Sequence, residues 1–90
     1  MDKKEVGAYS WVARGSLRRA VLKALDKPRI VSDVYKEAKK HNPLISLNNT
    51  SDTLRAFEEK KIAICINPKE RVGRIYKLTL IGEKVSKEIE

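Results

Sequence analysis

The sequence predicts one α+β domain in which helices predominate, and three features lead to that prediction. Ninety residues is a usual length for a single domain. Apolar residues recur at helical spacing in several stretches between Leu17 and Ile89. Two short apolar runs separated by a polar, turn-rich loop precede the last of these stretches, which is the pattern of a β-hairpin. The expected order of elements is α-(β)-α-α-β-β-α.

The N-terminal part should contain an arm and then the most regular helix of the chain. Residues 1–11 are expected to form the arm, because residues 1–10 are polar and show no clear period. Lys27-Pro28 should end the helix that follows, since proline disfavours helical conformation in the residue before it. The apolar positions of this helix are Leu17, Ala20, Val21, Ala24 and Leu25.

A short strand and a second helix are expected next. Residues 29–31 can form only a very short strand. Ser32 is a suitable N-cap for the second helix, which should end at residues 41–43. The side chains that this helix should bury are Val34, Tyr35 and Ala38.

The third helix is predicted over residues 46–61. Leu44 and Ile45 should be turn residues that pack into the core, and Ser46 is a suitable N-cap. The buried stripe should comprise Leu47, Thr50, Leu54 and Phe57.

A hairpin and a last helix complete the chain. The hairpin is predicted over residues 62–78, with a first strand at 62–66, a loop at 67–73 and a returning strand at 74–78. Thr79 should cap a C-terminal helix over residues 79–90. Its apolar stripe comprises Ile81, Val85 and Ile89.

Two segments resemble the winged helix-turn-helix regulators of the MarR, ArsR and PadR-like group of archaea and bacteria. One is Leu54-Arg55-Ala56-Phe57-Glu58-Glu59-Lys60-Lys61-Ile62, and the other, which is more specific, is Gly73-Arg74-Ile75-Tyr76-Lys77-Leu78-Thr79-Leu80-Ile81-Gly82. The resemblance extends loosely over residues 12–90. It implies a three-helix core, a β-wing of two or three strands and a C-terminal helix. It also implies that residues 46–61 are a DNA-recognition helix and residues 62–78 a wing.

Lys61 departs from the pattern of this group, which usually has glycine at the end of the recognition helix. A left-handed backbone conformation at this position is easy for glycine and costs other residues about 1 kcal/mol. We therefore expect either a different turn or mild strain at Lys61.

Charge points in the same direction as the resemblance. The formal net charge is +8 and the isoelectric point is about 9.8, which favours polyanionic partners, although lysine-rich surfaces also keep unrelated proteins soluble. The predicted binding residues lie on the recognition helix and the wing. They are Ser46, Asn48, Asn49, Ser51, Asp52, Arg55, Lys69, Arg71 and Arg74.

Each group of these residues has an expected role. Asparagine can pair with adenine and arginine with guanine, so Asn48, Asn49 and Arg55 would read bases. Asp52 would accept from cytosine or orient Arg55. Serine hydroxyls would contact phosphates, and the wing would lie along the backbone or in the minor groove. Alternatively, the asparagines are polar surface, Arg55 pairs with Glu58 or Glu59, and the wing residues are solvated.

The sequence does not predict an enzyme, a cofactor, a metal site or a small-molecule ligand. It lacks a nucleophile–base pairing and a phosphate-binding glycine loop. His41 has no second ligand at metal-binding spacing. Cys65, the only cysteine, is expected to be a buried or half-buried structural thiol because a lone cysteine on a strand has no evident activator; a redox sensor is the alternative.

The expected partners are double-stranded DNA and a second copy of the chain. Tyr9, Trp11 and Val12 are difficult to place in a small core, so the N-terminal region and the first and last helices are predicted to form a homodimer interface. No apolar run approaches the roughly 20 residues that span a bilayer, and a cytoplasmic location is expected. The predicted function is that of a sequence-specific, dimeric transcriptional regulator. The alternatives are a winged-helix adaptor that binds proteins and a nonspecific architectural binder of nucleic acid.

Overall fold

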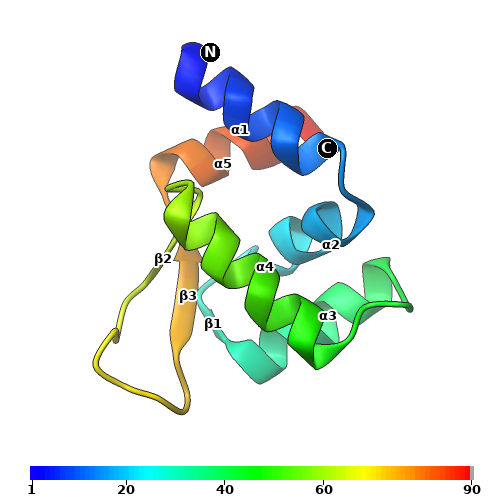
Figure 1. Cartoon of the computed structure of the whole chain (residues 1–90), viewed down its shortest axis with the longest axis vertical. Coiled ribbons are helices and arrows are strands. Elements are labelled where there is room, and N and C mark those ends of the chain that lie inside the picture. The colour runs from blue at the N-terminus through cyan, green and yellow to red at the C-terminus, as the bar shows by residue number, and fades with distance from the viewer. Residues whose placement is uncertain (90) are drawn as a thin grey trace.

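The computed structural model describes residues 1–89, which form five helices and three short strands (Figure 1). In chain order these are α1 (Lys3–Ala13), α2 (Ser16–Ala24), β1 (Arg29–Ile30), α3 (Val31–His41), α4 (Leu47–Glu59), β2 (Ala63–Cys65), β3 (Ile75–Leu78) and α5 (Leu80–Ile89). Figure 1 shows α1 and α5 side by side at one end of the molecule and the β2–β3 loop projecting at the other.

The region predicted as an arm over residues 1–11 is mostly helical. Asp2 accepts a hydrogen bond from the Glu5 backbone N–H (2.8 Å), and the Glu5 side chain accepts from the Asp2 N–H, which forms a capping box. The buried face of α1 comprises Glu5, Ala8 and Val12. Because a glutamate occupies one of these three positions, the apolar period is hidden, and the arm prediction is wrong for this reason.

The next two helices follow the sequence pattern closely. Ala20, Val21 and Ala24 of α2 and its capping residue Leu25 are buried, as are Val34 and Ala38 of α3. Leu17 and Tyr35, which were expected on the same buried faces, are only partly buried. Ser32 is not an N-cap, since α3 begins at Val31 and the capping residue is Ile30. Ile30 is held in extended conformation because it pairs with Ile75 of β3, and this pairing fixes the start of the helix.

Helix α4 is capped by Ser46 as predicted, but its buried stripe starts later. Thr50, Leu54 and Phe57 are fully buried. Leu47 is 49% exposed and Leu44 is 89% exposed, so the prediction that both pack into the core is wrong. Ile45, at 3% exposure, is the residue that packs into the core at this end of the helix, and the two leucines remain exposed to solvent.

The three strands form an antiparallel sheet in the order β1-β3-β2. Ala63 and Cys65 of β2 and Tyr76 of β3 are buried, whereas Ile64 between them is 41% exposed. Cys65 is buried, as predicted. Strands β2 and β3 lie within the predicted hairpin of residues 62–78, and β1 lies within the short strand predicted at residues 29–31.

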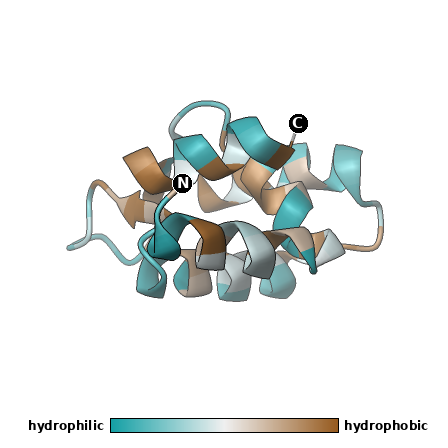
Figure 2. Ribbon diagram, turned by 90° about the horizontal axis from the view of Figure 1, so that it is seen from above, coloured by the Kyte–Doolittle hydropathy of each residue, from teal (hydrophilic) through white to brown (hydrophobic). Residues whose placement is uncertain are grey.

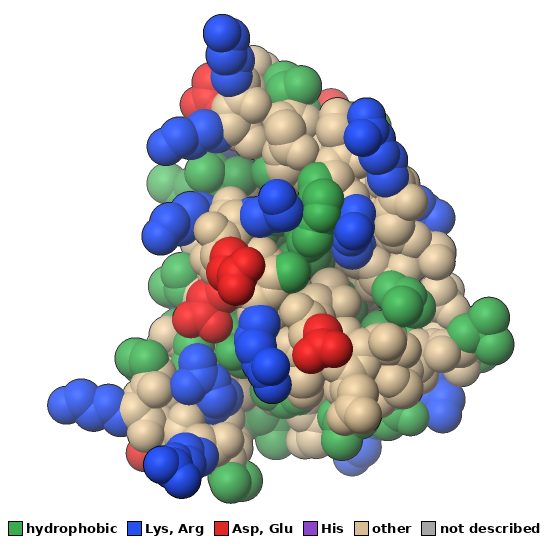
Figure 3. Space-filling model, in the orientation of Figure 1, with side chains coloured by type: hydrophobic (Ala, Val, Ile, Leu, Met, Phe, Trp, Pro, Cys, Tyr) green, Lys and Arg blue, Asp and Glu red, His purple; other side chains and the backbone are tan. Residues whose placement is uncertain are grey.

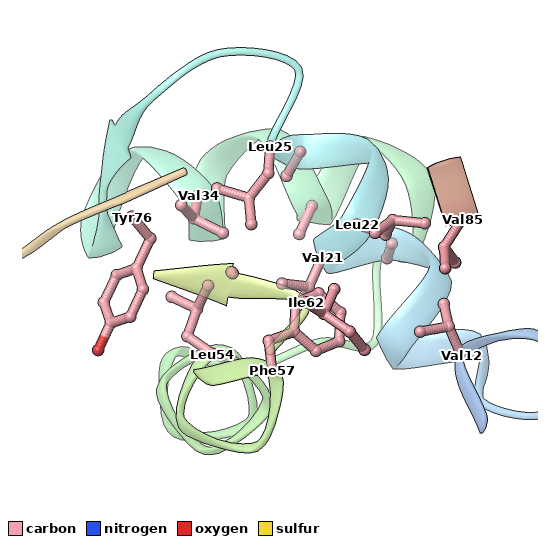
Figure 4. Packing of buried hydrophobic residues seen from close by; sticks show 14 of the residues in the cluster. Val12, Val21, Leu22, Leu25, Val34, Leu54, Phe57, Ile62, Tyr76 and Val85 are labelled. Carbon is pink, nitrogen blue, oxygen red and sulfur yellow. The ribbon is translucent and has the colours of Figure 1, made fainter. Parts of the chain in front are cut away.

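The core lies between the helices and one face of the sheet (Figure 4). In that view Val12 of α1 and Val85 of α5 lie together at one end, and Tyr76 lies at the other. Figure 2 shows hydrophobic and hydrophilic colours on the same helices, as expected when one face of a helix is buried. Among residues 1–89, no helix is long and apolar enough to cross a membrane.

Trp11 is accommodated within the monomer. Its ring meets Phe57 edge-on, with 5.8 Å between centroids, and lies against the Arg18 guanidinium (4.2 Å) and the Lys60 ammonium (4.9 Å). Val12 is fully buried in the same core. These two residues therefore do not require a second copy of the chain to cover them.

Thr79 joins the end of α4 to the start of α5. Its hydroxyl donates to the Lys61 carbonyl (2.6 Å), and its backbone N–H donates to the Ile62 carbonyl (3.0 Å). The same hydroxyl oxygen accepts from the Gly82 N–H (3.1 Å), so Thr79 caps α5 as predicted. The whole arrangement is consistent with a winged-helix-like fold, with α3 and α4 as consecutive helices beside a hairpin.

Candidate nucleic-acid interface

The start of α4 is fixed by a capping box between Ser46 and Asn49. The Asn49 N–H donates to Ser46 Oγ (3.0 Å), while Asn49 Oδ1 accepts from the Ser46 N–H (3.2 Å) and from its hydroxyl (2.8 Å). Both residues were predicted to contact nucleic acid, and the structure uses them to begin the helix.

Because of this cap, Asn48 and Asn49 differ in their ability to pair with a base. Bidentate pairing with adenine requires the amide oxygen and the amide N–H of one side chain. Asn49 Oδ1 is already engaged with Ser46, whereas Asn48 is exposed. Asn48 is therefore the better candidate for a base contact.

Arg55 and Asp52 lie side by side on the exposed face of α4. Arg55 Nη1 is 3.8 Å from Asp52 Oδ1, and the two side chains are 71% and 75% exposed. A pair this exposed is worth at most about 1 kcal/mol and is easily exchanged for another partner. The expectation that Asp52 orients Arg55 agrees with this geometry.

A cleft of about 230 Å³ lies between α4 and the hairpin loop. It brings together four of the nine predicted binding residues, two from the helix and two from the loop: Ser51, Arg55, Arg71 and Arg74. Val31, Leu54, Gly73 and Tyr76 complete its lining. Residues that are remote in sequence thus form one basic surface.

Arg74 is held within the protein. Its guanidinium donates to the carbonyls of Pro68 (3.1 Å) and Glu70 (3.3 Å) and to the Tyr76 hydroxyl (3.3 Å). It also lies 3.7 Å from Glu58 Oε1 of α4. The hydrogen bond to Tyr76 is the main reason why the pKa of Arg74 is raised. With these contacts, Arg74 braces the loop against α4 more than it offers a free cation.

Tyr76 extends this brace into the core. Its hydroxyl donates to Glu58 Oε1 (3.3 Å), and burial raises the pKa of the phenol, which keeps it protonated as a donor. Glu58 and Tyr76 were not singled out as site residues from sequence. Their link spans 18 positions, so no local pattern could have indicated it.

Asn67 orders the hairpin loop from within. Its Oδ1 accepts from the Ile75 N–H (2.7 Å), and its Nδ2 donates to the Gly73 carbonyl (2.9 Å). Gly73 has a φ of +72°, a conformation that favours glycine. The sequence signal was the Asn-Pro dipeptide, which indicated a turn without showing what the side chain bonds to.

Lys69 and Arg71 are exposed on the loop between β2 and β3. Figure 3 shows basic side chains on this projecting part of the molecule, with acidic side chains over α4 beside it. The basic surface is therefore concentrated on the loop, and the helix face carries charges of both signs.

Of the two outcomes expected at Lys61, a different turn or a strained residue, the structure has the second: Lys61 adopts the left-handed conformation, with a φ of +64°. The Ile62 N–H donates to the Phe57 carbonyl (2.8 Å) and the Lys61 N–H to the Glu58 carbonyl (3.2 Å), which is a Schellman motif. The turn is thus the one that glycine would make, and Lys61 carries the strain.

Comparison with known proteins supports the fold. No family model and no curated protein matches the sequence. The crystal structure of diamide-treated YodB from B. subtilis is similar, with a TM-score of 0.69 and 24% sequence identity. The match covers 99% of this chain and 85% of that one. At this identity the likeness shows a shared fold.

Proposed function

We propose that this chain is a winged helix-turn-helix protein that binds double-stranded DNA with sequence specificity and regulates transcription. The observation that carries the proposal is the cleft in which Ser51 and Arg55 of α4 face Arg71 of the hairpin loop. In this proposal α3 and α4 are the helix-turn-helix, α4 is the recognition helix, and residues 62–78 are the wing.

The parts have distinct roles in the proposed complex. The N-terminal part of α4 enters the major groove, where Asn48 and Arg55 meet base edges. Lys69 and Arg71 contact phosphates or the minor groove. Phosphate contacts supply most of the affinity, which should fall steeply with salt, as expected for a chain of net charge +8.

We further propose that the active form is a homodimer formed through α1 and α5. These helices pack against each other, and they expose Val6 (48%) and Leu80 (77%). A two-fold dimer would present two recognition helices about 34 Å apart to a near-palindromic site.

The proposal is tested by binding to a randomised duplex pool. Fluorescence anisotropy is measured at low and at physiological salt, and the bound fraction is selected and sequenced. An enriched motif supports a specific regulator. Salt-sensitive binding without enrichment indicates an architectural binder, and no binding at low salt contradicts the proposal.

Two variants separate base reading from phosphate contact. Arg55→Ala should cost about 1–3 kcal/mol on the selected site and much less on random DNA. Arg71→Ala should weaken binding to all duplexes alike and reduce the salt dependence. Arg14→Ala, at the exposed end of α1, is the matched control and should bind as the parent does. Equal losses for Arg55→Ala on both DNAs would disprove base reading by this residue.

The second candidate is a protein-binding adaptor with the same fold. It is favoured by large apolar side chains that stand exposed at both ends of the proposed interface, Leu44 at 89% and Val72 at 87%. The charge of the loop and the basic cleft favour DNA over this alternative.

A further inference from the structure

The leading end of α4 exposes apolar side chains that the core does not use. Leu47, the first residue of α4, is 49% exposed, and Leu44 in the preceding turn is 89% exposed. A single exposed leucine is ordinary. These two, however, lie beside Asn48 at the end of the helix that the proposed function places in the major groove.

The backbone that carries these residues is well fixed. The Ser46–Asn49 capping box holds the first turn of α4. In the turn before it, Asn42 Oδ1 accepts from the Leu44 N–H (3.1 Å), and Ile45 is buried at 3% exposure. Leu47 and Asn48 are thus presented from an ordered helix start and need little reorganisation on binding.

Helical spacing places Leu47 with the cleft residues. Leu47, Ser51 and Arg55 lie at i, i+4 and i+8 and therefore form one row along α4. Ser51 and Arg55 of that row line the cleft beside the hairpin loop. Asn48 lies next to the row on the exposed face. An apolar group, an amide and a guanidinium are therefore available to one surface.

The major-groove edge of an A·T pair matches this set of groups. Adenine presents an acceptor and a donor to an amide side chain, and thymine presents an apolar C5-methyl group. Asn48 has its amide exposed, since the capping role falls to Asn49. A leucine has no hydrogen-bonding group and gains only from burying apolar surface, which a thymine methyl provides.

We infer that the leading end of α4 reads A·T base pairs, with Leu47 packed on a thymine methyl group and Asn48 paired with adenine. This inference rests on the proposed function and assigns the class of site that it recognises. Leu44 lies at the margin of this contact and shields it from water.

Replacing thymine with uracil in the selected duplex tests the inference, because uracil keeps every hydrogen-bonding group and lacks the methyl. The parent protein should bind the uracil duplex about fourfold more weakly for each methyl that Leu47 buries. Leu47→Ala should bind the thymine duplex at least about fourfold more weakly than the parent does, and it should bind the thymine and uracil duplexes with equal affinity. Ile64→Ala, which removes the same number of carbon atoms from an exposed position on β2, should retain the distinction. A thermal melt confirms that each variant is folded.

A second substitution in the DNA tests Asn48. With 7-deazaadenine, which lacks the N7 acceptor, the parent should lose affinity and Asn48→Ala should lose nothing further. Salt-sensitive binding with equal affinity for thymine and uracil, or discrimination that persists in Leu47→Ala, would overturn the inference and leave the proposed function standing. No binding to any duplex at low salt would overturn both.

Discussion

At the scale of single residues, the structure separates side chains of one type into different roles. Arg55 and Arg74 were both predicted to bind DNA. Arg74 donates hydrogen bonds to carbonyl groups of the loop, whereas the Arg55 side chain is exposed beside Asp52. Asn48 and Asn49 differ in the same way because of the capping box. Composition and spacing could not show which of these donors and acceptors form hydrogen bonds within the protein itself.

Lys61 gives a prediction at this scale. Its φ of +64° suits glycine, so Lys61→Gly should raise the free energy of unfolding by about 0.5–1 kcal/mol. Urea denaturation measures the change. Lys61→Ala removes the same ammonium group but keeps a Cβ, and should give little of this gain. Equal effects of the two variants would mean that charge, and not backbone strain, is responsible.

Gly82 gives a second prediction. A Cβ at this position would lie 2.1 Å from the Ile62 carbonyl oxygen, which is fixed backbone. Gly82→Ala should therefore destabilise the protein by about 1–3 kcal/mol or more. Gly7→Ala is the matched control, since a Cβ there meets nothing within 4 Å and α1 should gain up to about 1 kcal/mol. A neutral Gly82→Ala would show that α5 can shift away from Ile62.

At the scale of elements, the strongly amphipathic segments were predicted well and the weakly patterned ones were not. Helices α2, α3 and α4 have apolar stripes, so their existence followed from sequence. Helix α1 was missed because Glu5 lies in its buried face. The start of α3 was misplaced because the pairing of Ile30 with Ile75 fixes it, and that contact is remote in sequence.

The hairpin loop depends on Asn67 for its order, and this dependence can be tested. Asn67→Ala removes the hydrogen bonds to Ile75 and Gly73 that order the loop, together with the hydrogen bond that Asn67 Oδ1 accepts from the Cys65 thiol (3.4 Å). Amide exchange in residues 67–75 should accelerate, and DNA affinity should fall several-fold, because the loop must then be ordered on binding. Asn67→Asp keeps the acceptor for Ile75 and should retain part of the protection. Unchanged exchange in Asn67→Ala would contradict the bracing role.

At the scale of the whole molecule, a small core and a large positive charge act together. A chain of 90 residues buries limited apolar surface, and association with a second copy is a common remedy. The dimer proposed from sequence included Trp11 and Val12, which the structure places against their own core. The dimer proposal therefore rests on the exposed residues of α1 and α5, which are Val6 and Leu80.

Analytical ultracentrifugation tests the proposed dimer through α1 and α5. The parent should sediment as a dimer at micromolar concentration, and Val6→Glu or Leu80→Glu should produce monomers, because each places a charge in the proposed apolar contact. Val72→Glu, on the exposed hairpin loop, is the control and should leave the dimer intact. A parent that is monomeric at these concentrations would contradict the proposal.

The junction at Thr79 has a consequence for the DNA that such a dimer selects. One hydroxyl group links the Lys61 carbonyl at the end of α4 to the first turn of α5. If α5 forms the dimer contact, the angle between α4 and α5 sets how far apart the two copies of α4 lie. The number of base pairs between the half-sites of the operator would then depend on Thr79. A Thr79→Val variant that still folds should prefer a different spacer length while reading the same half-site sequence.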